Sequence, residues 1–185
     1  MQWVPFIILA WLAVLMQASV GKVLTFSGGS IGAVGPDLAA IVATFFALNV
    51  RGWADVMLAA FVLGLGLDLS AGGGAGFASA VGPMPVAYAL AAGMVYRIRE
   101  AFFREHWLTQ AMLAAIFCVV AHGLWITWQA LLAYRTATWA AYVRMWLQVL
   151  SLAGYTAVLM PLGHLALARC QRWFISQAEG RHRRR

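Results

Sequence analysis

The chain has 185 residues, of which 63% are hydrophobic and 10% are charged, and its formal net charge is +7. A soluble domain carries about 25% charged residues. A soluble fold of this length cannot cover so much apolar surface, so the composition excludes an ordinary soluble domain and predicts a protein that faces lipid. The length fits one domain.

Hydrophobic runs separated by polar or Gly/Pro-rich breaks predict six membrane helices. The expected ranges are about 3–20, 36–50, 53–69, 77–96, 107–133 and 142–168. No Lys or Arg precedes the first run, so it is interpreted as a retained helix and not as a cleaved signal. The expected fold class is an all-α membrane protein, with a six-helix transmembrane bundle over residues 1–168 and a basic tail over residues 169–185.

The second and third runs are short for membrane spans. Their length corresponds to about 22–26 Å of helix, whereas the hydrocarbon core of a bilayer is about 30 Å thick. They are therefore expected to form a tight helical hairpin, partly shielded from lipid by neighbouring helices. A crossing pair and a re-entrant pair both return the chain to the same side, so the topology of the other helices does not depend on this choice.

The distribution of basic residues predicts the orientation. With both termini in the cytoplasm, ten Lys and Arg side chains fall on the inner side and three on the outer side. The inner set is Arg51, Arg97, Arg99, Arg104, Arg169, Arg172, Arg181, Arg183, Arg184 and Arg185, and the outer set is Lys22, Arg135 and Arg144. This bias follows the positive-inside rule, and Trp and Tyr residues near the predicted helix ends agree with it. The basic tail is expected to rest on anionic lipid headgroups, not to bind nucleic acid.

Acidic residues at membrane depth are costly, so each requires an explanation. Asp37 follows Gly35-Pro36, and an acidic residue in this position is typical of a helix start. Asp68 lies near the C-terminal end of its predicted helix, where the helix dipole disfavours a negative charge. It is expected either to be exposed in the outer loop or to organise that loop, and we consider an ion pair between Asp68 and Arg144 as a hypothesis.

Other reactive groups give no pattern typical of a catalytic, metal or cofactor site. The predicted depths of His122 and His164 differ by about 15 Å, which argues against a shared haem and favours hydrogen-bonded core histidines. Cys118 and Cys170 are isolated, so they predict neither a metal site nor a structural disulfide. The chain lacks a nucleophile elbow, a phosphate loop and a zinc-protease motif. The sequence therefore predicts a protein that is not an enzyme and has no cofactor.

Several short motifs occur in order between about residues 30 and 100. Pro36-Asp37-Leu38 opens the second predicted helix, and Arg51-Gly52 forms the turn before the third. Gly64-x-Gly66-Leu67-Asp68-Leu69-Ser70 then leads into a glycine-rich loop that contains Gly72 and closes at Gly76. This order and spacing resemble the MreD family, the small rod-shape-determining membrane proteins of bacteria. The stretch from Gly72 to Gly76 departs from the family, which often has Pro-x-Gly there, and this puts loop-specific contacts in doubt.

The resemblance implies a non-enzymatic scaffold in the bacterial inner membrane that supports peptidoglycan synthesis and cell shape. The implied partners are MreC, a bitopic periplasmic coiled-coil protein, and more loosely MreB, RodA and a class B penicillin-binding transpeptidase. The residues expected to bind a partner or to hold the structure are Pro36, Asp37, Arg51, Gly52, Gly64, Asp68, Gly72, Gly76 and Arg144.

The fold of this family also resembles the substrate-binding subunits of vitamin transporters. The alternative function is therefore a membrane subunit that binds a small molecule. Such a subunit should bring polar groups together at an outer cavity, whereas a scaffold should present an apolar groove to a partner helix.

Overall fold

The computed structural model describes residues 2–27, 32–71, 83–101, 106–132 and 139–174, and these residues form an almost entirely helical protein. The α-helices are α1 (Trp3–Val23), α2 (Leu38–Asn49), α3 (Trp53–Ala71), α4 (Pro83–Ile98), α5 (Trp107–Leu132) and α6 (Trp139–Phe174). A short 3₁₀ helix, η1 (Arg99–Ala101), follows α4. Two short antiparallel strands, β1 (Phe26–Ser27) and β2 (Ala33–Val34), form a hairpin in which Phe26 is paired with Val34.

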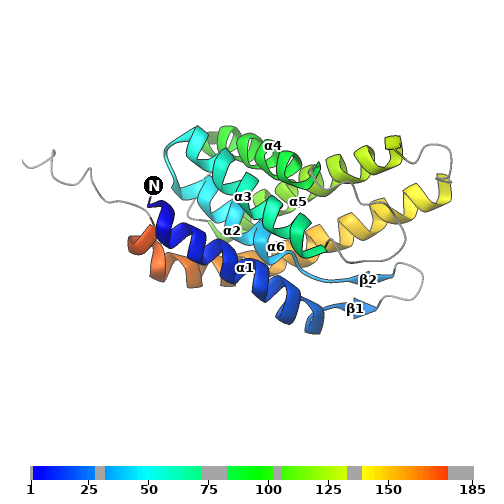
Figure 1. Ribbon diagram of the computed structural model, residues 1–185, viewed down its shortest axis with the longest axis horizontal. Helices are drawn as coiled ribbons and strands as arrows, with labels where there is room; N and C mark the ends of the chain where they lie inside the picture. The colour runs from blue at the N-terminus through cyan, green and yellow to red at the C-terminus, as the bar shows by residue number, and fades with distance from the viewer. Residues whose placement is uncertain (1, 28–31, 72–82, 102–105, 133–138, 175–185) are drawn as a thin grey trace, which may run out of the picture.

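Among the described residues, four helices are long and apolar enough to cross a membrane. These stretches are Trp3–Val23, Trp53–Ser70, Trp107–Leu131 and Trp139–Cys170. The prediction of an all-α membrane protein is therefore confirmed. Figure 1 shows the start of α1 and the end of α6 at one end of the bundle, called the termini end here, and the strands at the other, called the hairpin end.

Helix α2 is the centre of the bundle. It contacts all five of the other α-helices, and every residue from Ala39 to Leu48 is buried. Its 12 residues extend about 18 Å at 1.5 Å per residue, which is too short to cross a bilayer alone. The expectation that the second helix is shielded from lipid is confirmed. Helix α3 is partly shielded, as expected: it buries Val56, Ala59, Ala60 and Leu63 and exposes Leu58, Leu65 and Leu69. With 19 residues it is longer than the predicted 53–69.

The glycines of the Gly64-x-Gly66 motif lie where α3 packs closely on its neighbours. A Cβ atom at Gly64 would lie 2.8 Å from the Cα atom of Pro85 and 2.9 Å from the carbonyl oxygen of Met84, both in α4. A Cβ atom at Gly66 would lie 2.7 Å from Cγ2 of Val14 in α1. Small residues of this kind let helix backbones approach closely within lipid. Gly64, predicted to be structural, therefore sits at the contact between α3 and α4.

The helix boundaries differ from the predicted ranges mainly at α6. This helix begins at Trp139 and ends at Phe174, so it is longer than the predicted 142–168, because a helix can continue past its apolar stretch into the interface. Helix α4 begins at Pro83, as expected if the two prolines delay its start. The earlier start predicted at residue 77 lies outside the described residues. The β1–β2 hairpin was not predicted, because its glycine-rich sequence was interpreted only as a break.

Candidate functional site: a buried polar cluster at the start of α2

Asp37 is the N-cap of α2, and it is buried, with 3% of its surface exposed. Its Oδ1 atom accepts a hydrogen bond of 2.9 Å from the backbone N–H of Ala40. This bond satisfies one of the N–H groups that the first turn of a helix leaves without a partner. The prediction that Asp37 marks a helix start is confirmed, although the residue also has a second role.

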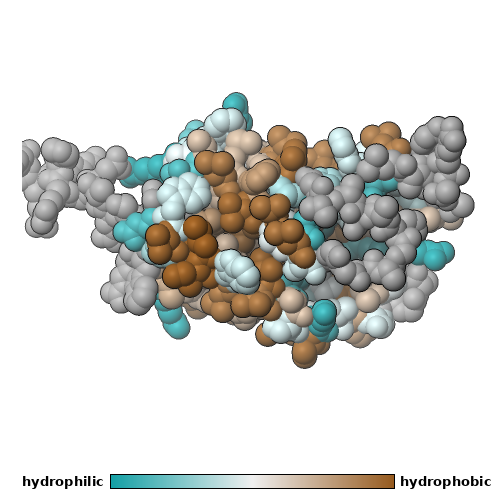
Figure 2. Space-filling model, in the orientation of Figure 1, coloured by the Kyte–Doolittle hydropathy of each residue, from teal (hydrophilic) through white to brown (hydrophobic). Residues whose placement is uncertain are grey.

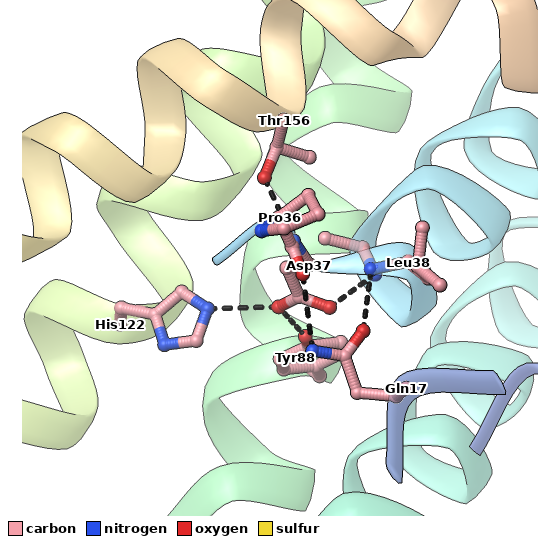
Figure 3. Close-up of polar contacts among 8 residues, drawn as sticks. Gln17, Pro36, Asp37, Leu38, Tyr88, His122 and Thr156 are labelled. Atoms are coloured by element: carbon pink, nitrogen blue, oxygen red, sulfur yellow. Dashed lines mark hydrogen bonds and ion pairs between the residues drawn. The ribbon is translucent and has the colours of Figure 1, made fainter. Parts of the chain in front are cut away.

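The other carboxylate oxygen of Asp37 contacts two more helices (Figure 3). Oδ2 accepts a hydrogen bond from the hydroxyl of Tyr88 in α4 and lies 2.8 Å from Nε2 of His122 in α5. Tyr88 is completely buried, and the side chain of His122 is 13% exposed. Three donors around a carboxylate stabilise its charged form, because hydrogen bonds to an ionised acceptor are stronger than hydrogen bonds to a neutral acceptor.

The backbone of residues 36–38 is hydrogen-bonded to two further helices, α6 and α1. The N–H of Asp37 donates to Oγ1 of Thr156 in α6, at 2.9 Å. Gln17 in α1 bridges the residues on either side, since its Nε2 donates to the carbonyl of Pro36 at 3.0 Å and its Oε1 accepts from the N–H of Leu38 at 2.7 Å. One short segment of chain therefore ties together α1, α2, α4, α5 and α6.

The cluster lies deep within the bundle. Gln17 is six residues before the end of α1, or about 9 Å from it at 1.5 Å per residue. His122 is ten residues before the end of α5, or about 15 Å, and Thr156 is 17 residues after the start of α6, or about 25 Å. The chain passes β2 and enters the bundle before α2 begins, so Asp37 is enclosed by helices. A carboxylate enclosed in this way needs partners within the protein.

A pocket of about 280 Å³ reaches His122 from the hairpin end. One side is formed by Ala33, Val34 and Gly35 beside β2, and the others by α5 and α6. The residues that α5 contributes are His122, Trp125 and Ile126, and those from α6 are Met145, Gln148, Val149 and Leu152. The cluster is therefore closed by protein around Asp37 and bordered by a cavity at His122.

The ion pair considered between Asp68 and Arg144 is not found. Asp68 is half-buried near the end of α3, and Arg144 is exposed in α6. No salt bridge joins these two side chains, both of which belong to the described part of the chain. The reason is the packing order: α3 packs on α1, α2 and α4, whereas α6 packs mainly on α5 and α2. Asp37, not Asp68, has a basic side chain beside it, since Nε2 of His122 lies 2.8 Å from its Oδ2.

The remaining predicted residues are at the opposite end of α2 or outside the described residues. The carbonyl of Arg51 accepts a hydrogen bond from the hydroxyl of Tyr96, and the N–H of Val56 donates to the carbonyl of Gly52 at 3.1 Å. These contacts hold the turn between α2 and α3. Gly72 and Gly76 lie outside the described residues, and the expectation for their loop stays a prediction.

A buried arginine completes the C-terminal end of α2. Nη1 of Arg99, which is 4% exposed, donates to the carbonyls of Ala47 and Val50, both at 2.6 Å. Its guanidinium carbon lies 3.8 Å from the centre of the Tyr96 ring, at cation–π distance. The last carbonyls of a helix need such donors. From the sequence, Arg99 was predicted only to be a positive charge on the cytoplasmic side. Its role as a cap of α2 was not predicted.

The sequence did not show that Gln17, Tyr88 and Thr156 belong to the site. Each is a single polar residue within an apolar helix, and such residues usually pack against another polar group when they lie at membrane depth. His122 was expected to be a hydrogen-bonded core histidine, and the structure confirms this and adds that its partner is Asp37. Among the described residues, no group of three His, Cys, Asp or Glu side chains is placed to hold a metal ion.

No family model matches the chain, and no curated protein or solved structure matches it.

Proposed function

We propose that this protein is a scaffold of the bacterial inner membrane, of the MreD type, and that it binds the transmembrane helix of a bitopic partner resembling MreC. Its role is to support the elongation machinery that builds peptidoglycan, together with proteins like MreB, RodA and a class B penicillin-binding transpeptidase. Two observations support this proposal: the resemblance of the motifs between residues 30 and 100 to the MreD family, and an apolar groove that could receive a partner helix.

The groove between α1 and α3 is the observation that carries this proposal. It has a volume of about 420 Å³ and is lined by Ile7, Ala10, Trp11, Val14, Leu15, Ala18, Val62, Leu65, Gly66, Leu69 and Ser70. Figure 2 shows hydrophobic side chains gathered over this part of the molecule. Along α1 the groove runs from Ile7 to Ala18, which is about 16 Å or three helical turns.

The shape of the groove suits a helix better than a compact ligand. Ala18 is small and exposed, and the neighbouring Trp11 and Leu15 are large and exposed. Small residues beside large ones let a second helix approach closely and interdigitate, which is how helices associate within lipid. The lining contains one hydroxyl, that of Ser70, so the groove offers few polar groups that would fix a polar ligand.

Site-specific photo-crosslinking tests the proposal. Benzoylphenylalanine at Leu15 or Leu65, in the groove, should crosslink to a single-span membrane protein in a rod-shaped bacterial host. The same probe at Val158 or Leu162, which are exposed on α6, should give less than about a tenth of that product. Depletion of the protein should also make the cells round. A partner that co-purifies but crosslinks only through α6 would contradict the groove assignment, and cells that keep their rod shape would contradict the scaffold role.

A further inference from the structure

The pocket beside His122 is separate from the α1–α3 groove, because it lies between β2, α5 and α6. Along α6 it runs from Met145 to Leu152, about 10 Å at 1.5 Å per residue, and His122 lies at its deep end. Its volume of about 280 Å³ is close to the lower limit of about 300 Å³ for small-molecule sites. A compact ligand would therefore fill it.

His122 lines this pocket, and only one of its two ring nitrogens contacts Asp37. Nε2 faces Asp37 at 2.8 Å, and Figure 3 shows the second ring nitrogen, Nδ1, on the side of the ring away from Asp37. No residue that the structure describes hydrogen-bonds Nδ1. Because the carboxylate of Asp37 accepts at Nε2, that nitrogen carries a proton, and Nδ1 is the ring nitrogen that a ligand in the pocket could contact.

This arrangement selects an acid as the polar part of a ligand. If the ring is neutral, a carboxylic acid transfers its proton to Nδ1, and if the ring is already charged, a carboxylate binds the Nδ1–H group. Both routes end in the same pair of imidazolium and carboxylate. Asp37 also accepts from Tyr88 and Ala40, so its negative charge does not depend on His122 alone.

The rest of the pocket is suited to an apolar body. Trp125, Ile126, Val149 and Leu152 line it, and its exposed lining is mainly apolar. Arg144, the residue before Met145, is exposed in α6 and adds a positive charge toward the hairpin end.

We propose that the pocket beside His122 binds a small monocarboxylic acid, with the carboxylate on Nδ1 of His122 and the apolar body between α5 and α6. The same chemistry is present in a fatty acid that arrives from the bilayer and in a compact acid that arrives from water. Sodium octanoate represents the first source and sodium 2-naphthoate the second, and 2-naphthylmethanol is a neutral compound of matched shape.

The experiment uses the full chain in phosphatidylcholine bilayers, with binding measured by equilibrium dialysis against protein-free bilayers. At least one of the two acids should bind saturably, and the preferred acid identifies the source. His122→Gln should weaken binding at least tenfold, because the glutamine amide can still donate to Asp37 but has no counterpart of Nδ1. The matched control is His164→Gln in α6, at a histidine that packs on Phe45 and does not line the pocket, and it should leave binding unchanged.

Two further measurements separate ligand binding from a folding defect. Leu152→Trp should fill the pocket and abolish binding while leaving His122 in place. In solid-state NMR of ¹⁵N-histidine-labelled protein, the bound acid should change the Nδ1 signal of His122, through protonation of Nδ1 or a new hydrogen bond from Nδ1–H, and should leave the signals of His164 unchanged. The proposal is overturned if neither acid binds saturably, if 2-naphthylmethanol binds as well as 2-naphthoate, or if His122→Gln and Leu152→Trp bind like the unmodified protein.

Discussion

Asp37 does more than a helix N-cap requires. Capping α2 needs one acceptor, which Oδ1 provides to the N–H of Ala40. The second oxygen joins α4 and α5 through Tyr88 and His122. Removing Asp37 is costly, because Tyr88 and His122 would stay buried without their partner. One carboxylate therefore joins three helices, α2, α4 and α5.

Substitution of Asp37 should show these two contributions separately. Asp37→Ala removes the cap and the contacts with Tyr88 and His122, and it should lower the free energy of unfolding by about 3–5 kcal/mol. Asp37→Asn keeps an oxygen for the N–H of Ala40 but replaces the acceptor for Tyr88 and His122 by an amide N–H₂ group, so its cost should be smaller, about 1–3 kcal/mol. Unfolding by sodium dodecyl sulfate in mild detergent measures both, with the exposed Glu100→Gln as the control. An Asp37→Ala protein as stable as the control would exclude this role.

The sequence could predict one half of this site. Gly35-Pro36-Asp37 before an apolar run is a local pattern, so the helix start was predictable. The partners of Asp37 are 51 and 85 residues away, and they come together only when α4 and α5 pack on α2. A single Tyr or His within an apolar helix has no periodicity that would identify its partner.

Among the helices, α2 and α3 differ in how they are separated from lipid: α2 is short and buried by other helices, whereas α3 is longer and partly exposed. Lipid requires a span of about 20 apolar residues, but α2 has 12 and is enclosed by other helices instead. The hydropathy pattern predicted where the helices are, because lipid selects apolar residues strongly. It could not predict that α2 is buried and α3 partly exposed, because both runs are strongly apolar and the packing order of the helices decides which one is enclosed.

Gly64 offers a direct test of the packing of α3 on α4. In Gly64→Ala the new Cβ atom would meet backbone atoms at 2.8 and 2.9 Å, and a backbone cannot move aside as a flexible side chain can. We expect a loss of about 1–3 kcal/mol in the free energy of unfolding. Gly154→Ala in α6 is the matched control, because nothing lies within 4 Å of its Cβ position, and it should stabilise the protein by about 0.4–1 kcal/mol. Equal effects at both positions would exclude close packing at Gly64.

At the scale of the whole molecule, the two ends of the bundle differ in chemistry. The termini end holds the turn at Arg51 and the buried Arg99, whereas the hairpin end holds the strands and the mouth of the His122 pocket. The structure places the start of α1 and the end of α6 at the same end (Figure 1). Which end faces the cytoplasm follows only from the positive-inside rule, because a bundle of helices is physically compatible with either orientation.

Cysteine labelling in living cells would test the orientation and the crossing of α2 together. In a chain with Cys118 and Cys170 replaced by Ala, a membrane-impermeant maleimide should label Ser27→Cys in intact spheroplasts. It should label Gln2→Cys and Gly52→Cys only after the membrane is opened. The reverse pattern would show that the bundle is inverted. Labelling of both Ser27→Cys and Gly52→Cys in intact cells would show that the chain does not cross between them, since α2 can bridge a bilayer only if the extended segment before Asp37 supplies the missing length.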